Sequence, residues 1–264
     1  DKIVKFCKKN NIFLIEDCSQ AHGAVYKGKK VGSFGDISTW SFCQDKIIST
    51  GGEGGMISTN NKQLWLKCWS LKDHGKNYNS VFFKKHKIGF RWHHDNLGSN
   101  YRMTEMQAIL GRAQLKILDN QIKKRNIIAN LYLNGLKDYY KKYDILKEPN
   151  FNYIYSSQVK DKKLSSKNIH AFYRLNLFIN KKKIKQLKLL EELNLKKINC
   201  GVGSCPEIYR EKVFKDLKLH PKKRLSNAKL LGETSITFPI DPNRSITKVK
   251  LEIKSIKKVL NKYL

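Results

Sequence analysis

The stretch IEDCSQAHGAVYKGKKVGSFGDISTWSFCQDK, at residues 15–46, decides the fold of this chain. A short apolar run at residues 12–15 leads into it, and such a run is typical of a parallel strand that helices cover on both faces. Glu16 and Asp17 follow the run directly. A carboxylate is therefore expected at the carboxyl end of the strand, where open α/β sheets bind their ligands.

Patterns around this stretch predict the neighbouring elements. Residues 37–42 alternate and are rich in β-forming residues, so they predict a second strand. The string TGGEGGMIST at residues 50–59 predicts a glycine-rich loop and a third strand at 56–59. Residues 2–9 are expected to end an amphipathic helix, and residues 62–72 to form another helix. Together these elements predict an α/β fold.

A long helix is predicted from Thr104 onward, because apolar residues recur there with helical spacing. Thr104 and Gln107 have the spacing of a capping box, in which each side chain accepts a backbone N–H of the other residue. The helix is long enough to link two domains, a first at residues 1–125 and a smaller α+β domain at 126–264. The second domain is expected to contain strands near 153–158 and 171–178 and helices near 181–193, 225–231 and 247–264.

Basic residues far outnumber acidic ones: 53 Lys and Arg against 22 Asp and Glu give a formal net charge of +31. Nucleic-acid binding is one interpretation, since clustered cations neutralise phosphates. The lysines after residue 115 are instead spread mostly singly or in pairs, and no nucleic-acid-binding motif accompanies them. A solvated, lysine-rich surface is therefore favoured, which at most helps to attract anionic substrates. We expect no nucleic-acid partner.

The sequence shows no sign of a membrane span or a metal site. No apolar run approaches the roughly 20 residues that cross a bilayer, so no membrane partner is expected. The six cysteines form no CxxC pair, which is typical of reduced thiols in a cytoplasmic protein. Cys200, Cys205 and His170 match no common zinc spacing, so no metal is expected.

Four polar residues of the opening stretch have side chains suited to a chemical site. They are a carboxylate, an amide, a hydroxyl and an amine: Asp17, Gln20, Ser41 and Lys46. Taken singly, each has an ordinary explanation, as a surface acid or helix cap, a turn residue, or one lysine among many. Their joint order and the glycine-rich loop after them favour one common site.

The strings at residues 15–46 and 50–59 resemble the DegT/DnrJ/EryC1/StrS family of sugar aminotransferases, and GSNYRMTEMQAILGRAQLKILD at 98–119 resembles the interface segment and linker helix of that family. The resemblance implies fold type I of the transferases that depend on pyridoxal phosphate (PLP). That fold has a mainly parallel α/β large domain and a small C-terminal α+β domain. The family also forms homodimers with active sites at the subunit interface. Its phosphate cup and ring-stacking aromatic residue find no match, so we expect the large domain to be truncated.

The resemblance assigns roles to five residues. Lys46 matches the Schiff-base lysine that holds PLP, and Asp17, 29 residues earlier, matches the carboxylate that keeps the ring nitrogen protonated. These two are the expected catalytic residues. Gln20 would lie near the phenolic oxygen of the ring, and Ser41, five residues before Lys46, would donate a hydrogen bond to the phosphate. Asn100 resembles the residue that reaches the phosphate from the neighbouring subunit.

The reaction that the resemblance implies is amino transfer. An amino acid, with glutamate expected, would donate its amino group, and a keto or aldehydo sugar would receive it in the biosynthesis of amino sugars and surface polysaccharides such as O-antigens. Some members of the family have histidine in place of the lysine and act as dehydratases, so Lys46 favours amino transfer. Two substrate classes stay open: a nucleotide-linked keto sugar and a free octulosonic-type sugar acid.

Residues 73–99 form a polar insertion that contains His86, Arg91, His93 and His94. An anionic sugar acid or nucleotide phosphate is one ligand for this group, and an ordinary polar surface loop is the alternative. Two rival functions remain for the whole chain: a non-catalytic or regulatory member of the family, and a basic nucleic-acid-binding protein. The first would need a disabled site, and neither expected catalytic residue is altered.

Overall fold

The computed structural model describes residues 1–147, 168–203 and 205–264, so the strand predicted at 153–158 lies outside the described residues. The described chain forms two compact units, one of residues 1–120 and 168–171 and the other of 121–147, 172–203 and 205–264. The division into domains at residues 125 and 126 stays a prediction, since a compact unit need not be an independently folding domain.

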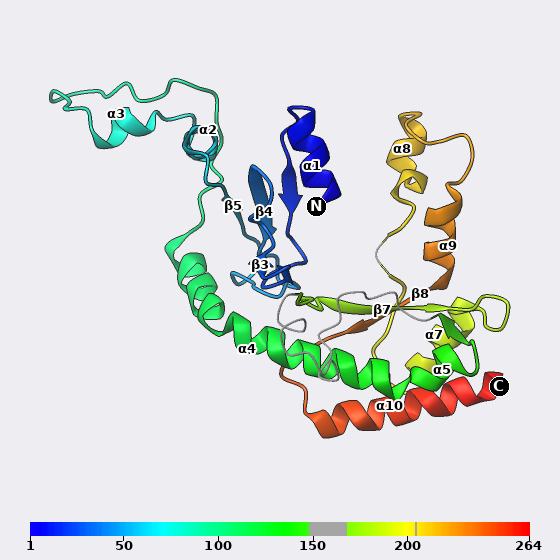
Figure 1. Cartoon of the computed structure of the whole chain (residues 1–264). Coiled ribbons are helices and arrows are strands. Elements are labelled where there is room, and N and C mark those ends of the chain that lie inside the picture. Colours follow the sequence, from blue (N-terminus) through cyan, green and yellow to red (C-terminus); the bar gives the residue numbers. More distant parts are fainter. Residues whose placement is uncertain (148–167, 204) are drawn as a thin grey trace. The chain divides into compact units, whose positions relative to one another are not determined.

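The first unit contains five strands, three helices and the first half of a fourth helix (Figure 1). The strands are β1 Ile15–Asp17, β2 Val25–Tyr26, β3 Lys29–Lys30, β4 Ile37–Ser41 and β5 Gly55–Ser58, and the helices are α1 Lys2–Lys9, α2 Lys62–Lys72, α3 Tyr78–Phe82 and α4 Glu105–Gly135. The bounds of α1 and α2 agree with the helices predicted there. The capping box is also confirmed, because Thr104 N donates to Gln107 Oε1 at 3.0 Å and Gln107 N donates to Thr104 Oγ1 at 3.3 Å.

The main sheet of this unit has the order β1-β4-β5. β1 runs parallel to β4, with Asp17 opposite Thr39, whereas β5 runs antiparallel to β4, with Gly55 opposite Ser41. The described sheet is therefore mixed, with its parallel pair where the expected site lies. A parallel pair places the carboxyl ends of both strands at one edge.

The first strand differs from its prediction. It begins at Ile15 and includes the two acidic residues, rather than ending before them. Its apolar neighbours are not covered on both faces, since Phe13 is 71% and Ile15 is 65% exposed. The expectation of two-sided burial was wrong for the described residues, in which β1 is an edge strand that pairs only with β4.

The two acids of β1 have different partners. Glu16 accepts hydrogen bonds from the backbone N–H groups of Gly32, Phe34 and Gly35 at 2.6–2.8 Å, and so organises the loop before β4. Gly35 has no room for a side chain, because a Cβ there would lie 2.6 Å from the carbonyl oxygen of Leu14. Glu16 therefore has a structural role, and the chemical role expected of Asp17 stays a prediction.

The second unit contains the rest of α4 and a sheet with the order β6-β7-β8, in which every pair is antiparallel. Its strands are β6 Leu146–Lys147, β7 Arg174–Ile179 and β8 Ser235–Pro239, and its helices are α5 Lys137–Lys141, α7 Gln186–Leu195, α8 Lys212–Asp216, α9 Ser226–Thr234 and α10 Ile246–Leu260, with short 3-10 turns at Ile208–Arg210 and Asn261–Tyr263. The strand predicted near 171–178 and the three helices predicted after it are present, each displaced by a few residues at one or both ends.

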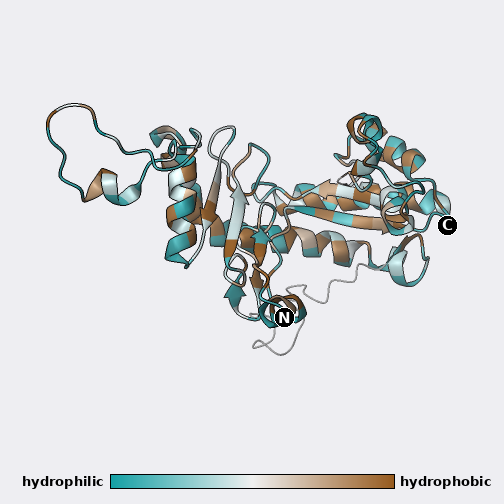
Figure 2. Cartoon of the chain, turned by 90° about the horizontal axis from the view of Figure 1, so that it is seen from above, coloured by the Kyte–Doolittle hydropathy of each residue, from teal (hydrophilic) through white to brown (hydrophobic). Residues whose placement is uncertain are grey.

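A continuous apolar core holds the second unit together. Alternate residues of β7, Leu175 and Leu177, are at most 1% exposed and belong to one cluster with Ile128 of α4 and Val249 of α10. Figure 2, coloured by hydropathy, shows both hydrophobic and hydrophilic residues along the helices and strands of the chain. Burying each such side chain contributes roughly 1.5–3 kcal/mol. The helices α4 and α10 approach closely at Gly135, where a Cβ would lie 2.7 Å from the side chain of Ile253.

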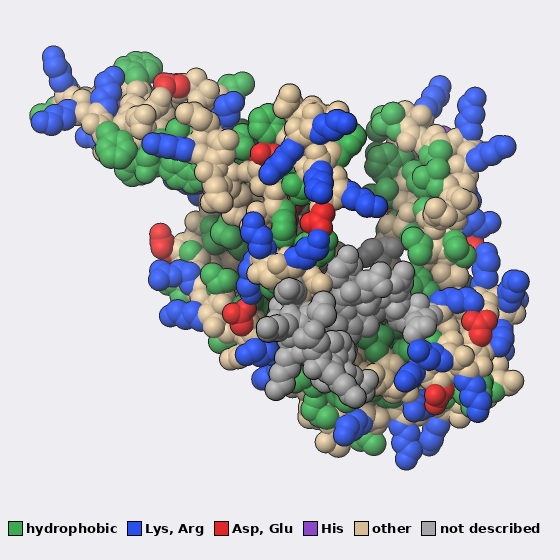
Figure 3. All heavy atoms as spheres, in the orientation of Figure 1, with side chains coloured by type: hydrophobic (Ala, Val, Ile, Leu, Met, Phe, Trp, Pro, Cys, Tyr) green, Lys and Arg blue, Asp and Glu red, His purple; other side chains and the backbone are tan. Residues whose placement is uncertain are grey.

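Most charged side chains of the described residues lie on the surface, whereas Asp73, Arg125 and Glu207 are buried. On the face shown in Figure 3, Lys and Arg side chains are scattered over both units and form no single stripe. This distribution agrees with the solvated surface that the spacing of the lysines favours. Among the residues that the structure describes, no helix is both long and apolar enough to cross a membrane.

Candidate active site

Asp17 and Ser41 project from the same face of the main sheet. Side chains alternate between the two faces along a strand, and residues paired in register share a face. Asp17 pairs with Thr39, and Ser41 follows Thr39 by two residues, so all three share one face. Glu16 and Trp40 belong to the other face. The structure therefore places the expected carboxylate and hydroxyl on neighbouring strands with a common orientation.

Lys46 lies in a tight turn directly after β4. Its backbone N–H donates to the carbonyl of Cys43 at 3.0 Å, which closes a β-turn around Gln44 and Asp45. The next two residues, Ile47 and Ile48, are 3% and 4% exposed and anchor the chain beyond the turn. The side chain of Lys46 is itself 16% exposed. The amine is thus held on a backbone that is fixed on both sides.

Asp17 and Lys46 interact electrostatically across these two elements. Ser19 donates to Asp17 Oδ1 from its hydroxyl at 2.5 Å and from its backbone N–H at 3.0 Å. These two bonds lower the pKa of Asp17 from its ordinary value, and the positive charge of Lys46 lowers it further. Asp17 is therefore a carboxylate at neutral pH. A carboxylate and an amine from different elements are thus close enough to interact electrostatically.

The glycine-rich loop after Lys46 is tied to α4 by two glutamines. Gln114 accepts from Ser49 N at 3.0 Å and donates to Ser49 O at 2.7 Å, while Gln107 donates to Glu53 O at 2.8 Å. The two glutamines were not among the residues predicted to organise the site. Their spacing of seven residues is two helical turns, so a search for amides on one face of the helix could have found them.

Gln20 and Asn100 are not brought to Lys46 by any contact among the described residues. Gln20 is an exposed turn residue, and Asn100 is exposed at the far end of the insertion. The side-chain oxygen of Asn100 accepts from Arg102 Nε at 3.0 Å, and Arg102 in turn lies 3.6 Å from Asp73. The oxygen is therefore occupied, and the amide nitrogen is the group that suits an external acceptor such as phosphate. The roles expected for both residues stay predictions.

The histidines of the insertion hold the loop itself. His86 Nε2 lies 2.7 Å from the carbonyl of Ser80, and His93 Nδ1 lies 3.1 Å from the Ser80 hydroxyl. The two imidazole rings are 4.5 Å apart, nearly perpendicular. These contacts are sufficient to explain His86 and His93 as structural residues, which agrees with the interpretation of an ordinary polar surface loop.

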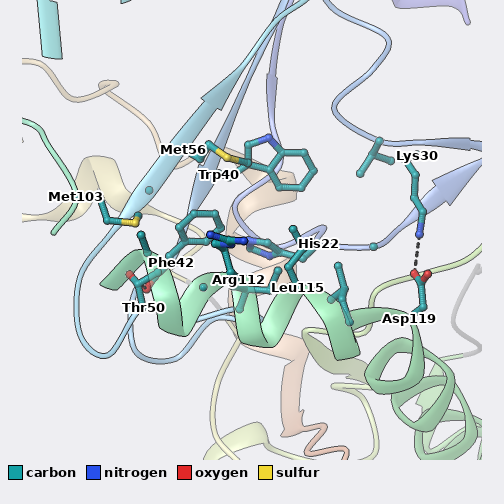
Figure 4. Close-up of a pocket in the computed structure, with 17 residues that line it drawn as sticks. His22, Lys30, Trp40, Phe42, Thr50, Met56, Met103, Arg112, Leu115 and Asp119 are labelled. Carbon is teal, nitrogen blue, oxygen red and sulfur yellow. Dashed lines mark hydrogen bonds and ion pairs between the residues drawn. The ribbon is translucent and has the colours of Figure 1, made fainter. Parts of the chain in front are cut away.

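A cavity of about 670 Å³ lies between β4, β5 and α4 (Figure 4). Trp40 and Phe42 line it, with His22 between them at ring distances of 5.4 and 5.8 Å. Trp40 belongs to the face of β4 opposite to Ser41. Asp17, Ser41 and Lys46 are not among the residues that line the cavity.

The arrangement of Asp17, Ser41 and Lys46 fits PLP. The cofactor requires an amine, a carboxylate for its pyridine nitrogen and hydrogen-bond donors for its phosphate. The described residues supply one of each: Asp17 and Ser41 share one face of the sheet, and Lys46 is close enough to Asp17 for its charge to lower the pKa of that carboxyl. No group of three or more potential metal ligands is found in the described part of the chain.

Comparison with known proteins gives consistent matches. The sequence model of the DegT/DnrJ/EryC1/StrS aminotransferase family matches residues 1–257. GDP-perosamine synthase of Escherichia coli O157:H7 is 43% identical over 136 residues, which are 52% of this chain and 34% of that protein. The UDP-4-amino-4,6-dideoxy-N-acetyl-beta-L-altrosamine transaminase of Campylobacter jejuni subsp. jejuni serotype O:23/36 (strain 81-176) is 32% identical over 268 residues, 99% of this chain and 62% of that protein.

Among solved structures, the aminotransferase from Psychrobacter cryohalolentis superposes with a TM-score of 0.89 at 40% sequence identity, covering 99% of this chain and 65% of that one. This superposition confirms the predicted fold class, that of fold type I. The chain spans less than two thirds of the length of each of these three proteins.

Proposed function

This chain belongs to the DegT/DnrJ/EryC1/StrS aminotransferase family, and from that premise we propose that the complete protein is a PLP-dependent aminotransferase that converts a nucleotide-linked keto sugar into an amino sugar. Glutamate is the proposed amino donor. The observation that carries the proposal is that Asp17 shares one face of the sheet with Ser41 and is close enough to Lys46, on a separate element, for the charge of that amine to lower its pKa.

Each of the three residues has a task that follows from its chemistry. Lys46 would bind the cofactor covalently through Nζ, and Ser41 would donate a hydrogen bond to the phosphate. Asp17, ionised at neutral pH, would stabilise the proton on the pyridine nitrogen. Bound PLP supplies an electron sink for the electron pair that remains when a proton leaves the substrate carbon.

Lys46 is also the proposed base and acid of the reaction. After the donor amino acid displaces it, Nζ would take the proton from the donor's α-carbon. In the second half of the reaction, Nζ would deliver a proton to the sugar carbon that receives the amino group. The tight turn and the two buried isoleucines after Lys46 hold its backbone in place through both steps.

The names of the relatives favour a nucleotide-linked sugar over a free sugar acid. The relatives from E. coli and C. jejuni are named for a GDP sugar and a UDP sugar, respectively. Scattered lysines on the surface agree with an anionic substrate but do not distinguish a diphosphate from a sugar carboxylate.

The proposal is tested by a substrate screen with the complete gene product, since this chain spans 62–65% of two relatives. The enzyme is incubated with glutamate, PLP and one acceptor: a GDP-, UDP- or dTDP-linked keto sugar, or a free octulosonic acid. We expect 2-oxoglutarate to form only with a nucleotide-linked acceptor. Turnover of the free sugar acid alone would overturn the substrate class, and no turnover of any acceptor would count against the proposed activity.

We further propose that the protein is a homodimer in which Asn100 of one subunit serves the site of the other. The variants Asn100→Ala and Lys46→Ala should then each be weak or inactive alone. If the two are mixed and allowed to exchange subunits, about half of the dimers are hybrids with one intact site, so about a quarter of the wild-type activity should return. An Asn100→Ala and Asp17→Ala pair is the matched second combination. Failure of both mixtures to recover activity, with hybrids shown by native mass spectrometry, would place Asn100 in its own subunit's site or outside both.

A further inference from the structure

Asp45 is an acidic residue beside the reactive amine that the proposed mechanism does not use. Its Oδ1 lies 3.3 Å from Nζ of Lys46, and its side chain is 44% exposed. The two residues occupy the last two positions of the β-turn that the Cys43 carbonyl closes. The backbone of this turn therefore keeps the carboxylate beside the amine.

Other groups on the surrounding elements support this turn or add to its charge. The thiol of Cys43 donates to Glu53 of the glycine-rich loop at 3.3 Å, which ties the start of the turn to that loop. From β1, Asp17 is close enough for the charge of Lys46 to lower its pKa. Lys46 thus faces one carboxylate in contact and a second across the site. Asp45 is the closer of the two carboxylates, and the proposed mechanism gives it no role.

We propose that Asp45 is a positioning residue that keeps the nitrogen of Lys46 protonated, both in the free amine and when this nitrogen is bound to the cofactor. This inference rests on the proposed function. An opposite charge within about 4–6 Å favours the charged form of a group. A negative Asp45 therefore stabilises the cationic nitrogen in each state. The partial exposure of Asp45 leaves it screened by water, so the effect is moderate.

In this proposal, the two carboxylates stabilise protons at two different nitrogens. Asp17 would hold the proton at the far end of the cofactor, on the pyridine nitrogen. Asp45 would hold the proton at the near end, on the nitrogen that joins Lys46 to the cofactor. A protonated nitrogen makes the adjoining carbon more open to attack by the amino donor, so Asp45 would support the first chemical step at neutral pH.

The test is a pH titration of the complete, PLP-loaded protein. The visible absorbance of lysine-bound PLP changes when the linking nitrogen loses its proton, so the midpoint of that change reports the nitrogen's pKa without any turnover. Removing a negative neighbour should lower this midpoint. We expect Asp45→Asn to lower the midpoint of the titration by about one pH unit. Asp45→Ser, a second uncharged variant at this exposed position, should do the same.

Two controls separate a local effect from a general one. Asp45→Glu keeps the carboxylate and should retain a midpoint near that of the wild type. Asp216→Asn makes the same change of charge on α8 of the other unit and should leave the midpoint unchanged. An unchanged midpoint in both uncharged variants, with visible absorbance present, would overturn the role of Asp45 alone. Absence of the visible absorbance in the wild-type protein would overturn the proposed function and, with it, this inference.

Discussion

Replacing Lys46 with alanine in the complete gene product is expected to lower the rate of amino transfer by at least ~10³-fold, because both covalent attachment and proton transfer at the substrate carbon depend on this amine. Alanine provides neither. Steady formation of 2-oxoglutarate from glutamate and the sugar acceptor measures the loss. Reduction with borohydride before digestion gives a second measurement, since it fixes the cofactor to the wild-type peptide that contains Lys46 and to no peptide of the variant.

Lys67→Ala is the matched control, because Lys67 is an exposed residue of α2 and alanine suits a helix. This control should retain wild-type activity and the labelled peptide. Full transamination by the Lys46→Ala variant would contradict the proposed function. Labelling of a different lysine in the wild-type protein would reassign the residue and leave the class of reaction intact.

Replacing Asp17 with asparagine should lower turnover on the order of a hundredfold or more, since an amide does not stabilise a proton on the pyridine nitrogen as a carboxylate does. Asparagine keeps the shape of the side chain and can still accept from Ser19. The cofactor should therefore remain attached to Lys46, with its visible absorbance, while kcat falls. A variant with normal kcat would show that another group protonates the ring.

Ser19 provides a milder test of the same carboxylate. Its two hydrogen bonds are the main reason that the pKa of Asp17 is lowered, and Ser19→Ala removes the hydroxyl bond. The pKa of Asp17 should then rise toward its ordinary value. Above that value Asp17 stays ionised in both proteins, so turnover at neutral pH should change little. As the pH falls through the raised pKa, the variant should lose activity before the wild type does.

Local patterns were enough for most of the elements. The helices at residues 2–9 and 62–72 and the capping box of Thr104 and Gln107 depend on side chains at most four residues apart, and all three were predicted from the sequence. The prediction that the apolar strand at residues 12–15 is covered on both faces was wrong. Its burial depends on which segments pack over it, and spacing along the chain does not contain that information.

In the candidate site, too, the sequence predicted residue identities but not how they are arranged in space. Motif order identified Asp17, Ser41 and Lys46 as candidates, but it did not show that the first two share a face. That follows from the parallel register of β1 and β4, in which Asp17 lies opposite Thr39. The hydrogen bonds between α4 and the glycine-rich loop could not be predicted from the sequence either, because Gln114 and Ser49 are 65 residues apart.

By itself, the sequence determined the family, the fold class and the residue types of a site for PLP. These follow from the identity and order of residues in one stretch, 15–59, and from the periodicity of the long helix after it. The resemblance pointed to Asp17, and only the tertiary structure showed what the other acid of β1 does: Glu16 accepts hydrogen bonds from three backbone amides of a loop that lies 16–19 residues away. It also placed Asp45 beside Lys46, because the direction of a side chain in a turn depends on the backbone bond that closes the turn.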